Sequence, residues 1–298
     1  MKNKSFQNLA GAFLVAMAGI LWGSIGIFIR PFSENLTSMQ IVAARAALTT
    51  LIMFMFLLVF KRNLLKIKLR DIWCFIGTGL CSIVFFNYCY FRCMNMTSLS
   101  VAAVLLYTAP AIVMLISALV FKEKITVQKI SALLLAMLGC ALVNGIFTSK
   151  SLVSKEGILI GLGAGFGYAL YSIFSRFALN KGYNSLTITF YTFLIATIFL
   201  IPITDWETMI PAVTTDINTF GIYILFALTS TVIPYILYTY GLQKLTPAKA
   251  SIIASVEPVS ATAVGFIFFN ERPTLTSFFA MECILFSIIL LAINKDKK

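Results

Sequence analysis

Ten long apolar stretches, separated by short polar segments, fill this 298-residue chain. A helix needs roughly 20 predominantly apolar residues to cross the hydrocarbon core of a bilayer, and stretches of that length are too long for barrel strands. Only 11% of the residues are charged, whereas about a quarter would be charged in a soluble domain. The sequence therefore predicts an all-α polytopic membrane protein with ten transmembrane helices. The expected helices are 9–30, 37–60, 71–92, 97–121, 127–147, 156–179, 185–203, 218–243, 247–269 and 274–293.

The basic residues are distributed unevenly between the two sides of the predicted membrane. With a cytoplasmic N-terminus, most of the 23 Lys and Arg residues fall in cytoplasmic segments, and the densest group lies in 61–70. Because Lys and Arg are enriched in cytoplasmic loops, we expect both termini in the cytoplasm. The net charge of +12 then reflects topology, and no nucleic-acid partner is expected. The compact loops, without a recognisable transit segment, indicate a bacterial plasma membrane. The basic residues expected outside are Arg30, Arg92, Lys150, Lys155 and Arg272.

Cysteine and histidine usage gives no sign of a metal or cofactor. All six cysteines lie within or directly beside predicted spans, and the chain has no histidine. Cys89 and Cys93 are one helical turn apart, but a metal site would need further ligands. We expect the cysteines to pack as small apolar residues, without disulfides. No Walker A motif for binding ATP phosphates is present.

The second half of the chain repeats the first. From the third stretch onward, a shift of 148 residues aligns Tyr90 with Tyr238 and Glu123 with Glu271. At the start of each half the shift is 146 residues. Because five is an odd number of spans, the second copy must enter the membrane from the opposite side. We expect two inverted five-helix repeats, 9–147 and 156–293, an arrangement typical of secondary transporters with a substrate site near the midplane.

Several motifs accompany this repeat. They are Gly-x-x-Trp-Gly from Gly19 to Gly23, Arg45 in the second stretch, Pro110 followed by Glu123, and Glu257-Pro258 followed by Glu271. Through them, and over nearly its whole length, the chain resembles EamA-type members of the drug/metabolite transporter superfamily. The resemblance implies a ten-helix carrier with cytoplasmic termini, in a family whose members mostly export amino acids, other metabolites or toxic compounds.

The leading functional prediction is a secondary transporter. We expect an exporter of small metabolites, such as amino acids or amphipathic and aromatic compounds, that works by alternating access, with protons as the candidate coupling ion. A lipid or lipid-linked-sugar flippase would share the fold and remains an alternative. An intramembrane enzyme is less favoured, because the chain has no histidine and no Gly-x-Ser-x-Gly elbow.

Two charged residues deep in the spans are candidate site residues, because a charge in the bilayer needs a partner or a wet cavity. Glu257 precedes Pro258, which removes one helical hydrogen bond. Glu257 is expected to line a cavity and bind a proton or a cationic substrate, or else to form a permanent salt bridge or a hydrogen bond to a neighbouring helix. Arg45 is expected to bind a substrate carboxylate, or else to pair with Glu257 or with free carbonyls.

Aromatic residues at matching depths are the other candidates. Trp22, Tyr90 and Tyr238 are expected to wall a substrate pocket, where cation–π contact would suit a cation. The alternative is ordinary packing, since aromatic residues are common in membrane proteins. Helix breaks are expected at Pro110, Pro234 and Pro258.

Overall fold

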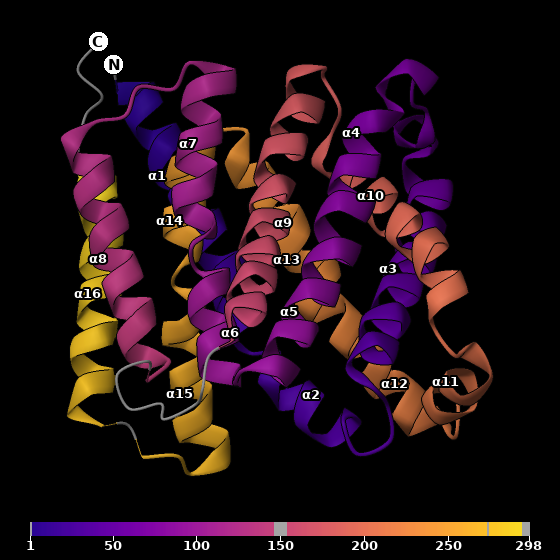
Figure 1. Ribbon diagram of the computed structural model, residues 1–298. Coiled ribbons are helices and arrows are strands. Elements are labelled where there is room, and N and C mark those ends of the chain that lie inside the picture. The colour runs from indigo at the N-terminus through magenta and orange to yellow at the C-terminus, as the bar shows by residue number, and fades with distance from the viewer. Residues whose placement is uncertain (1, 146–153, 273, 294–298) are drawn as a thin grey trace.

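The chain folds into a bundle of antiparallel helices, which a computed structural model describes for residues 2–145, 154–272 and 274–293 (Figure 1). No strand occurs in these three ranges. The α-helices are α1 (Lys2–Gly23), α2 (Gly26–Phe32), α3 (Ser38–Phe60), α4 (Ile72–Ile76), α5 (Phe85–Met96), α6 (Leu99–Leu106), α7 (Ala109–Phe121), α8 (Val127–Val143), α9 (Lys155–Asn180), α10 (Ser185–Leu200), α11 (Trp206–Val213), α12 (Ile217–Ala227), α13 (Ile233–Leu242), α14 (Pro247–Ala254), α15 (Glu257–Phe269) and α16 (Leu275–Ile293). Two π-helical segments, Gly77–Val84 and Leu228–Val232, join α4 to α5 and α12 to α13. Short 3₁₀ turns lie at Arg62–Leu65, Leu69–Asp71 and Ile201–Ile203.

Within the described ranges, eight helical segments are long and apolar enough to cross a bilayer, and α8 and α16 are shorter apolar helices. The predicted all-α polytopic membrane fold is therefore confirmed. The helix α8 ends before the predicted span 127–147 does. Gly145 adopts a φ of 64°, and the Asn144 side chain donates to the Cys140 carbonyl at 2.8 Å, which together end the helix. Residues 146 and 147 lie outside the described part of the chain.

The first predicted span, 9–30, is not one continuous helix. The helix α1 extends back to Lys2 and stops at Gly23, and α2 begins at Gly26. Between them the Ser24 hydroxyl donates to the Leu21 carbonyl at 2.7 Å, so it satisfies one of the carbonyls left open at the helix end.

The two halves of the bundle run in opposite directions. In Figure 1, α1 begins and α16 ends at one end of the bundle, called here the terminal end, which also carries segment 61–70 and the turn from α7 to α8. The opposite end, called the far end, carries α2, α11 and the turn from α15 to α16. The helix α1 runs from the terminal to the far end, whereas its counterpart α9 runs the other way. The repeat-related turns after α7 and α15 consequently lie at opposite ends.

Helix packing follows the same symmetry. The helix α1 packs against α13 and α15, and its counterpart α9 packs against α5 and α7. The helices α3 and α10 pack against each other, as do α8 and α16. Each half therefore inserts its first helix between two helices of the other half, which places the core at the junction of the repeats.

Backbone details repeat as well. The π-helical segments end at positions 84 and 232, and the breaks after α6 and α14 fall at 107–108 and 255–256. Both pairs are related by the 148-residue shift. After α7 and α15, Lys122 (φ 53°) and Asn270 (φ 54°) adopt the left-handed conformation, which ends each helix in the same way.

Candidate functional site

A cavity of about 210 Å³ lies between the two repeats, in the middle of the bundle. Its walls are largely apolar and aromatic, with a small number of polar groups, which is the usual makeup of a small-molecule site. The first repeat contributes Trp22, Ile25, Ile29, Ser38, Ile41, Val42, Arg45, Phe86, Asn87, Tyr90, Phe91 and Leu106, and the second contributes Tyr168, Tyr235 and Glu257. The cavity extends toward the far end, where Ile29 and Ser38 lie.

Arg45 reaches the cavity from α3. Only 9% of this residue is exposed, and its Nε has no hydrogen-bond partner in the described part of the chain. A capping box between Thr37 and Gln40 fixes the start of α3, and the Gln40 amide also donates to Thr208 of α11 at 2.8 Å. Arg45 is therefore held on a rigid helix with hydrogen-bonding capacity left over for a ligand.

Glu257 reaches the cavity from the first turn of α15, directly after the break at 255–256. Its Oε2 accepts a hydrogen bond from the Tyr168 hydroxyl at 3.3 Å. The positive end of the helix dipole favours a carboxylate at this position. The helix α1 approaches closely here, since a Cβ on Gly23 would lie 2.5 Å from the Glu257 carbonyl oxygen.

No ion pair within 4.0 Å joins Arg45 to Glu257, although both line the cavity. The permanent pairing that the sequence left open is thus absent from this conformation. The two opposite charges are available to a molecule that lies between them.

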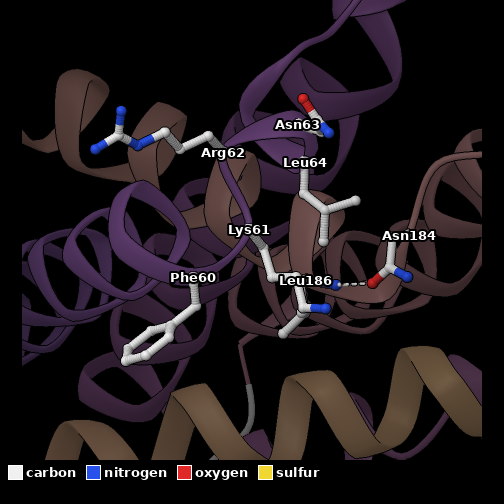
Figure 2. Close-up of a pocket in the computed structure, with 7 residues that line it drawn as sticks. All are labelled: Phe60, Lys61, Arg62, Asn63, Leu64, Asn184 and Leu186. Carbon is white, nitrogen blue, oxygen red and sulfur yellow. Dashed lines mark hydrogen bonds between the residues drawn. The ribbon is translucent and has the colours of Figure 1, made fainter.

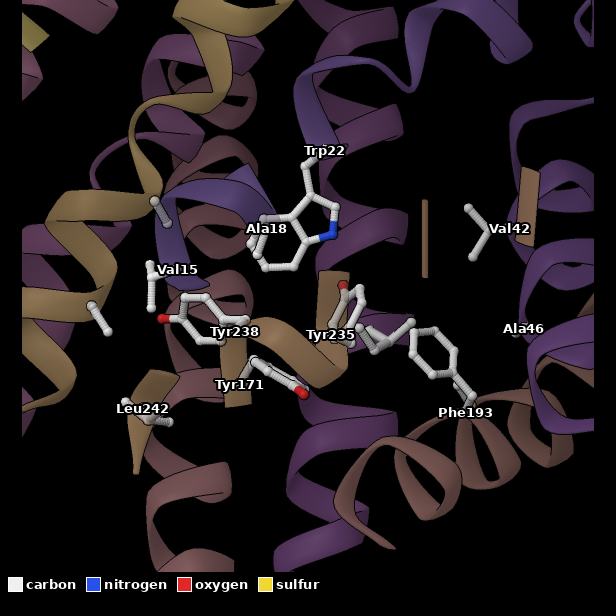
Figure 3. Packing of buried hydrophobic residues seen from close by; sticks show 14 of the residues in the cluster. Val15, Ala18, Trp22, Val42, Ala46, Tyr171, Phe193, Tyr235, Tyr238 and Leu242 are labelled. Carbon is white, nitrogen blue, oxygen red and sulfur yellow. The ribbon is translucent and has the colours of Figure 1, made fainter. Parts of the chain in front are cut away.

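The aromatic candidates divide into two groups. Trp22 and Tyr90 line the cavity. Tyr238 does not line the cavity. It packs against Trp22 on the side away from Val42, with ring centroids 5.4 Å apart (Figure 3). Tyr235, which also packs against Trp22 at 5.1 Å, lines the cavity in its place.

The cavity residue Tyr168 could have been found from the repeat. It aligns with Trp22 under the 146-residue shift, and both residues line the cavity. Repeat-related positions thus meet at the junction between the halves. The apolar wall residues Ile25, Ile29, Ile41 and Val42 carry no such signal, because apolar residues are everywhere in the spans.

The three prolines occupy equivalent positions. Pro110, Pro234 and Pro258 each lie in the first turn of a helix, α7, α13 and α15 respectively. Proline suits this turn, since the missing N–H would have no intrahelical partner. Pro110 and Pro258 follow the breaks at 107–108 and 255–256, and Pro234 follows a π-helical segment.

On the terminal side of the cavity, α9 and α13 contact each other through side-chain hydroxyls. The Tyr171 and Thr239 hydroxyls lie 2.8 Å apart, and those of Ser172 and Tyr238 lie 2.6 Å apart. One turn further on, Arg176 donates to the Leu242 carbonyl at 2.8 Å. We call the four hydroxyl-bearing residues Tyr171, Ser172, Tyr238 and Thr239 the hydroxyl closure.

The repeat-related residues at the far end do not form an equivalent closure. Tyr171 and Thr239 align with Ile25 and Phe91, and both of those residues line the cavity. Ser172 and Tyr238 align with Gly26 and Tyr90, and Tyr90 also lines the cavity. Equivalent positions are therefore joined by hydrogen bonds at one end, whereas at the other end Ile25, Tyr90 and Phe91 line the cavity.

No group of three or more His, Cys, Asp or Glu side chains suited to a metal ion occurs in residues 2–145, 154–272 and 274–293. The six cysteines are free thiols.

Inverted helical repeats around a central cavity define a polytopic membrane transporter. The chain belongs to the EamA-like transporter family, whose model matches it twice, over residues 9–145 and 155–293. This confirms the resemblance noted from the sequence motifs.

Curated relatives and a solved structure agree with this assignment. An "Uncharacterized transporter" from Archaeoglobus fulgidus is 26% identical over 284 residues and covers 94% of this chain and 95% of its own. "Uncharacterized transporter YxxF" from Bacillus subtilis is 26% identical over 304 residues, covering 99% and 93%. A solved structure described as "Crystal structure of protein" has a TM-score of 0.75 at 16% identity, covering 94% and 95%, so it shares the fold.

Proposed function

We propose that this membrane transporter is a secondary carrier that exports small metabolites by alternating access, with the central cavity as its substrate site. The proposal is based on a difference between repeat-related residues. Tyr171, Ser172, Tyr238 and Thr239 are hydrogen-bonded to one another in pairs, whereas the equivalent residues Ile25, Tyr90 and Phe91 line the cavity. Inverted repeats allow a carrier to exchange the conformations of its halves. If the two halves exchanged conformations, the hydroxyl closure would break and Ile25 and Phe91 would come together. The cavity would then open to the terminal end.

The cavity walls favour a substrate of amino-acid size. A volume of about 210 Å³ lies below the roughly 300–1,000 Å³ of pockets for drug-sized ligands, which favours a small metabolite over a lipid-linked sugar. Arg45 would bind a carboxylate through charge-assisted hydrogen bonds, and Glu257 would bind an ammonium group. The aromatic walls would accept an apolar or aromatic side chain.

Glu257 is also the candidate for proton coupling. A carboxylate that binds a proton at one face and releases it at the other could link the two movements. The only hydrogen bond to its side chain in the described part of the chain comes from Tyr168, so protonation would break no ion pair.

Counterflow into proteoliposomes tests the substrate site. Amino acids and related carboxylates would be screened first with the wild-type protein. Because a hydrogen bond to a charged group contributes about 1.5–3 kcal/mol, we expect Arg45→Gln to raise the KM for the accepted carboxylate by roughly 10- to 100-fold. Arg92→Gln is the matched control, since Arg92 is exposed and outside the cavity.

For Glu257→Gln we expect loss of proton-driven uptake, with Glu271→Gln, whose carboxylate is exposed at the far end, as control. A wild-type KM in Arg45→Gln would refute carboxylate binding at this site. Unchanged proton-driven uptake in Glu257→Gln would remove Glu257 from coupling.

A further inference from the structure

The densest positive charge on the protein lies away from the cavity, at the terminal end. Segment 61–70, between α3 and α4, contains five basic residues and no acidic one. All five are exposed, and within the described residues only Arg70 lies within 4.0 Å of an acidic side chain, that of Asp71. They are Lys61, Arg62, Lys66, Lys68 and Arg70.

This segment is fixed to the beginning of α10. The Thr187 hydroxyl donates to the Leu64 carbonyl at 2.8 Å, and the Tyr191 hydroxyl donates to the Leu65 carbonyl at 2.6 Å. The Lys68 amide donates to the Tyr183 hydroxyl at 3.0 Å. The backbone is thus held in place while the basic side chains project outward.

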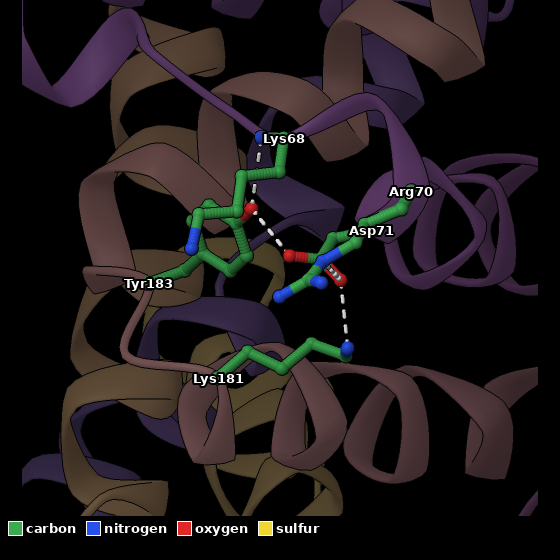
Figure 4. Close-up of polar contacts among 5 residues, drawn as sticks. All are labelled: Lys68, Arg70, Asp71, Lys181 and Tyr183. Carbon is green, nitrogen blue, oxygen red and sulfur yellow. Dashed lines mark hydrogen bonds and ion pairs between the residues drawn. The ribbon is translucent and has the colours of Figure 1, made fainter.

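Asp71, the acidic residue nearest in sequence to this segment, is paired with residues outside it. Asp71 is buried and accepts from Lys181 Nζ at 2.7 Å and from the Tyr183 hydroxyl at 2.9 Å (Figure 4). Partial burial raises the pKa of Tyr183, so its hydroxyl stays protonated as the donor. Arg70 reaches this carboxylate only at 4.0 Å. Lys61 and Arg62 consequently keep their positive charge for an external partner.

A pocket of about 540 Å³ opens beside these two residues (Figure 2). Lys61, Arg62, Asn63 and Asn184 form its polar wall. The Nε of Arg62 donates to the Leu58 carbonyl at 2.6 Å, and the Asn184 Oδ1 accepts from the Leu186 amide at 3.0 Å. Both side chains are therefore oriented, but the Arg62 guanidinium points away from the side chains of Lys61 and Asn184 (Figure 2).

The rest of the pocket is apolar. Phe60 and Leu186 line it, and Phe60 packs against Phe56 one turn deeper on α3, with ring centroids 5.3 Å apart. Phe56 and Phe60 are 42% and 68% exposed. An apolar track therefore leads from the charged pocket toward the middle of the membrane.

We propose that this pocket binds an anionic phospholipid, with its phosphate at Lys61 and Asn184 and an acyl chain along Phe60 and Phe56, while Arg62 adds positive charge nearby. Positive pockets between transmembrane helices favour anionic head groups. The apolar track distinguishes a lipid from a free phosphate ion, which would gain nothing from aromatic contacts. The proposal is independent of the transported substrate.

Native mass spectrometry of the detergent-solubilised protein, titrated with phosphatidylglycerol, phosphatidylcholine or inorganic phosphate, tests this site. Each basic residue near a membrane surface contributes about 1 kcal/mol to binding of anionic lipid. We therefore expect K61Q/R62Q to weaken phosphatidylglycerol binding by about 30-fold. The control K122Q/K124Q removes two exposed charges from another turn at the same end and should bind like the wild type.

Equal retention of phosphatidylcholine and phosphatidylglycerol by the wild type would overturn the proposal. So would an equal loss in K122Q/K124Q, which would indicate nonspecific attraction, or competition by inorganic phosphate at the same concentration as the lipid. Melting curves without added lipid should be the same for both variants. If K61Q/R62Q melts at a lower temperature than the wild type, Phe60→Ser is the second test of the site. This variant keeps every charge and should still weaken phosphatidylglycerol binding.

Discussion

Arg45 and Glu257 reach the same cavity from different structural settings. Arg45 lies within a long helix whose start is capped by Thr37 and Gln40. Glu257 lies at a helix start, and the backbone beside it is packed against Gly23. The position of the carboxylate consequently depends on a neighbour that has no side chain.

Replacing Gly23 tests this dependence. In Gly23→Ala the new Cβ would lie 2.5 Å from both the Glu257 carbonyl oxygen and the Ser260 Cβ, and a backbone carbonyl cannot rotate away. Overpacking costs about 1–3 kcal/mol, more than the gain of about 0.5–1 kcal/mol from replacing a helical glycine. We expect a lower melting temperature in detergent.

Gly26→Ala is the matched control, because no atom lies within 4 Å of its new Cβ. It should melt at or slightly above the wild-type temperature. If the two variants melted alike, the close packing of α1 on α15 would not hold Glu257 in place.

At the scale of helices, irregular segments lie next to the cavity in both repeats. The π-helical segments Gly77–Val84 and Leu228–Val232 end within one turn of Asn87 and Tyr235, which line the cavity. Such segments frequently occur at functional sites. The hydroxyl closure joins α9 to α13 within two turns of the end of the second of these segments, and under the proposed mechanism it would break for the cavity to open to the terminal end.

Removing two hydroxyls tests the hydroxyl closure. Each hydrogen bond contributes about 0.5–1.5 kcal/mol, so Y171F/Y238F should shift the conformational equilibrium by roughly 5- to 150-fold. A cysteine introduced at Ser175, which is fully buried, should then react faster with a maleimide, in a variant without the native cysteines. Tyr240→Phe, also on α13 but exposed, should leave the rate unchanged. An unchanged rate in Y171F/Y238F would show that other contacts keep this end closed.

For the whole molecule, the inverted repeats place corresponding turns at opposite ends. Lys124 and Arg272 are related by the 148-residue shift, and the turns that carry them lie at the terminal and far ends (Figure 1). From the distribution of basic residues we propose that the terminal end lies in the cytoplasm.

Labelling of Lys124→Cys and Arg272→Cys with an impermeant maleimide tests this assignment, in a background without the native cysteines. We expect Arg272→Cys to react in intact cells and Lys124→Cys to react only in inside-out vesicles. Reaction of both variants from one side would contradict the inverted arrangement.

The fold was largely predictable because hydropathy, length and charge act on every residue of a membrane helix. The equivalent prolines Pro110 and Pro258 also marked the broken spans. The two charged site residues were detectable because Arg45 and Glu257 stand out in apolar stretches. The sequence could not show that Tyr238 lies behind Trp22, since that depends on side-chain packing.

The end of the bundle at which the helices are joined was not predictable either. A carrier sequence must be compatible with two conformations, so the alignment of Tyr171 with Ile25 does not reveal which end is closed. That choice depends on small energy differences between contacts in the two halves.

In the proposed alternate conformation, contact between Ile25 and Phe91 would replace the hydroxyl closure, and the different chemistry of the two contacts would have a thermal consequence. Water can replace the hydrogen bonds of Tyr171 and Ser172, whereas burial of Ile25 against Phe91 gains strength on warming near room temperature. A higher temperature would therefore favour the conformation with contact between Ile25 and Phe91. A lower temperature would favour the conformation with the hydroxyl closure. A carrier with two such different contacts would open preferentially to different sides of the membrane at low and at high temperature.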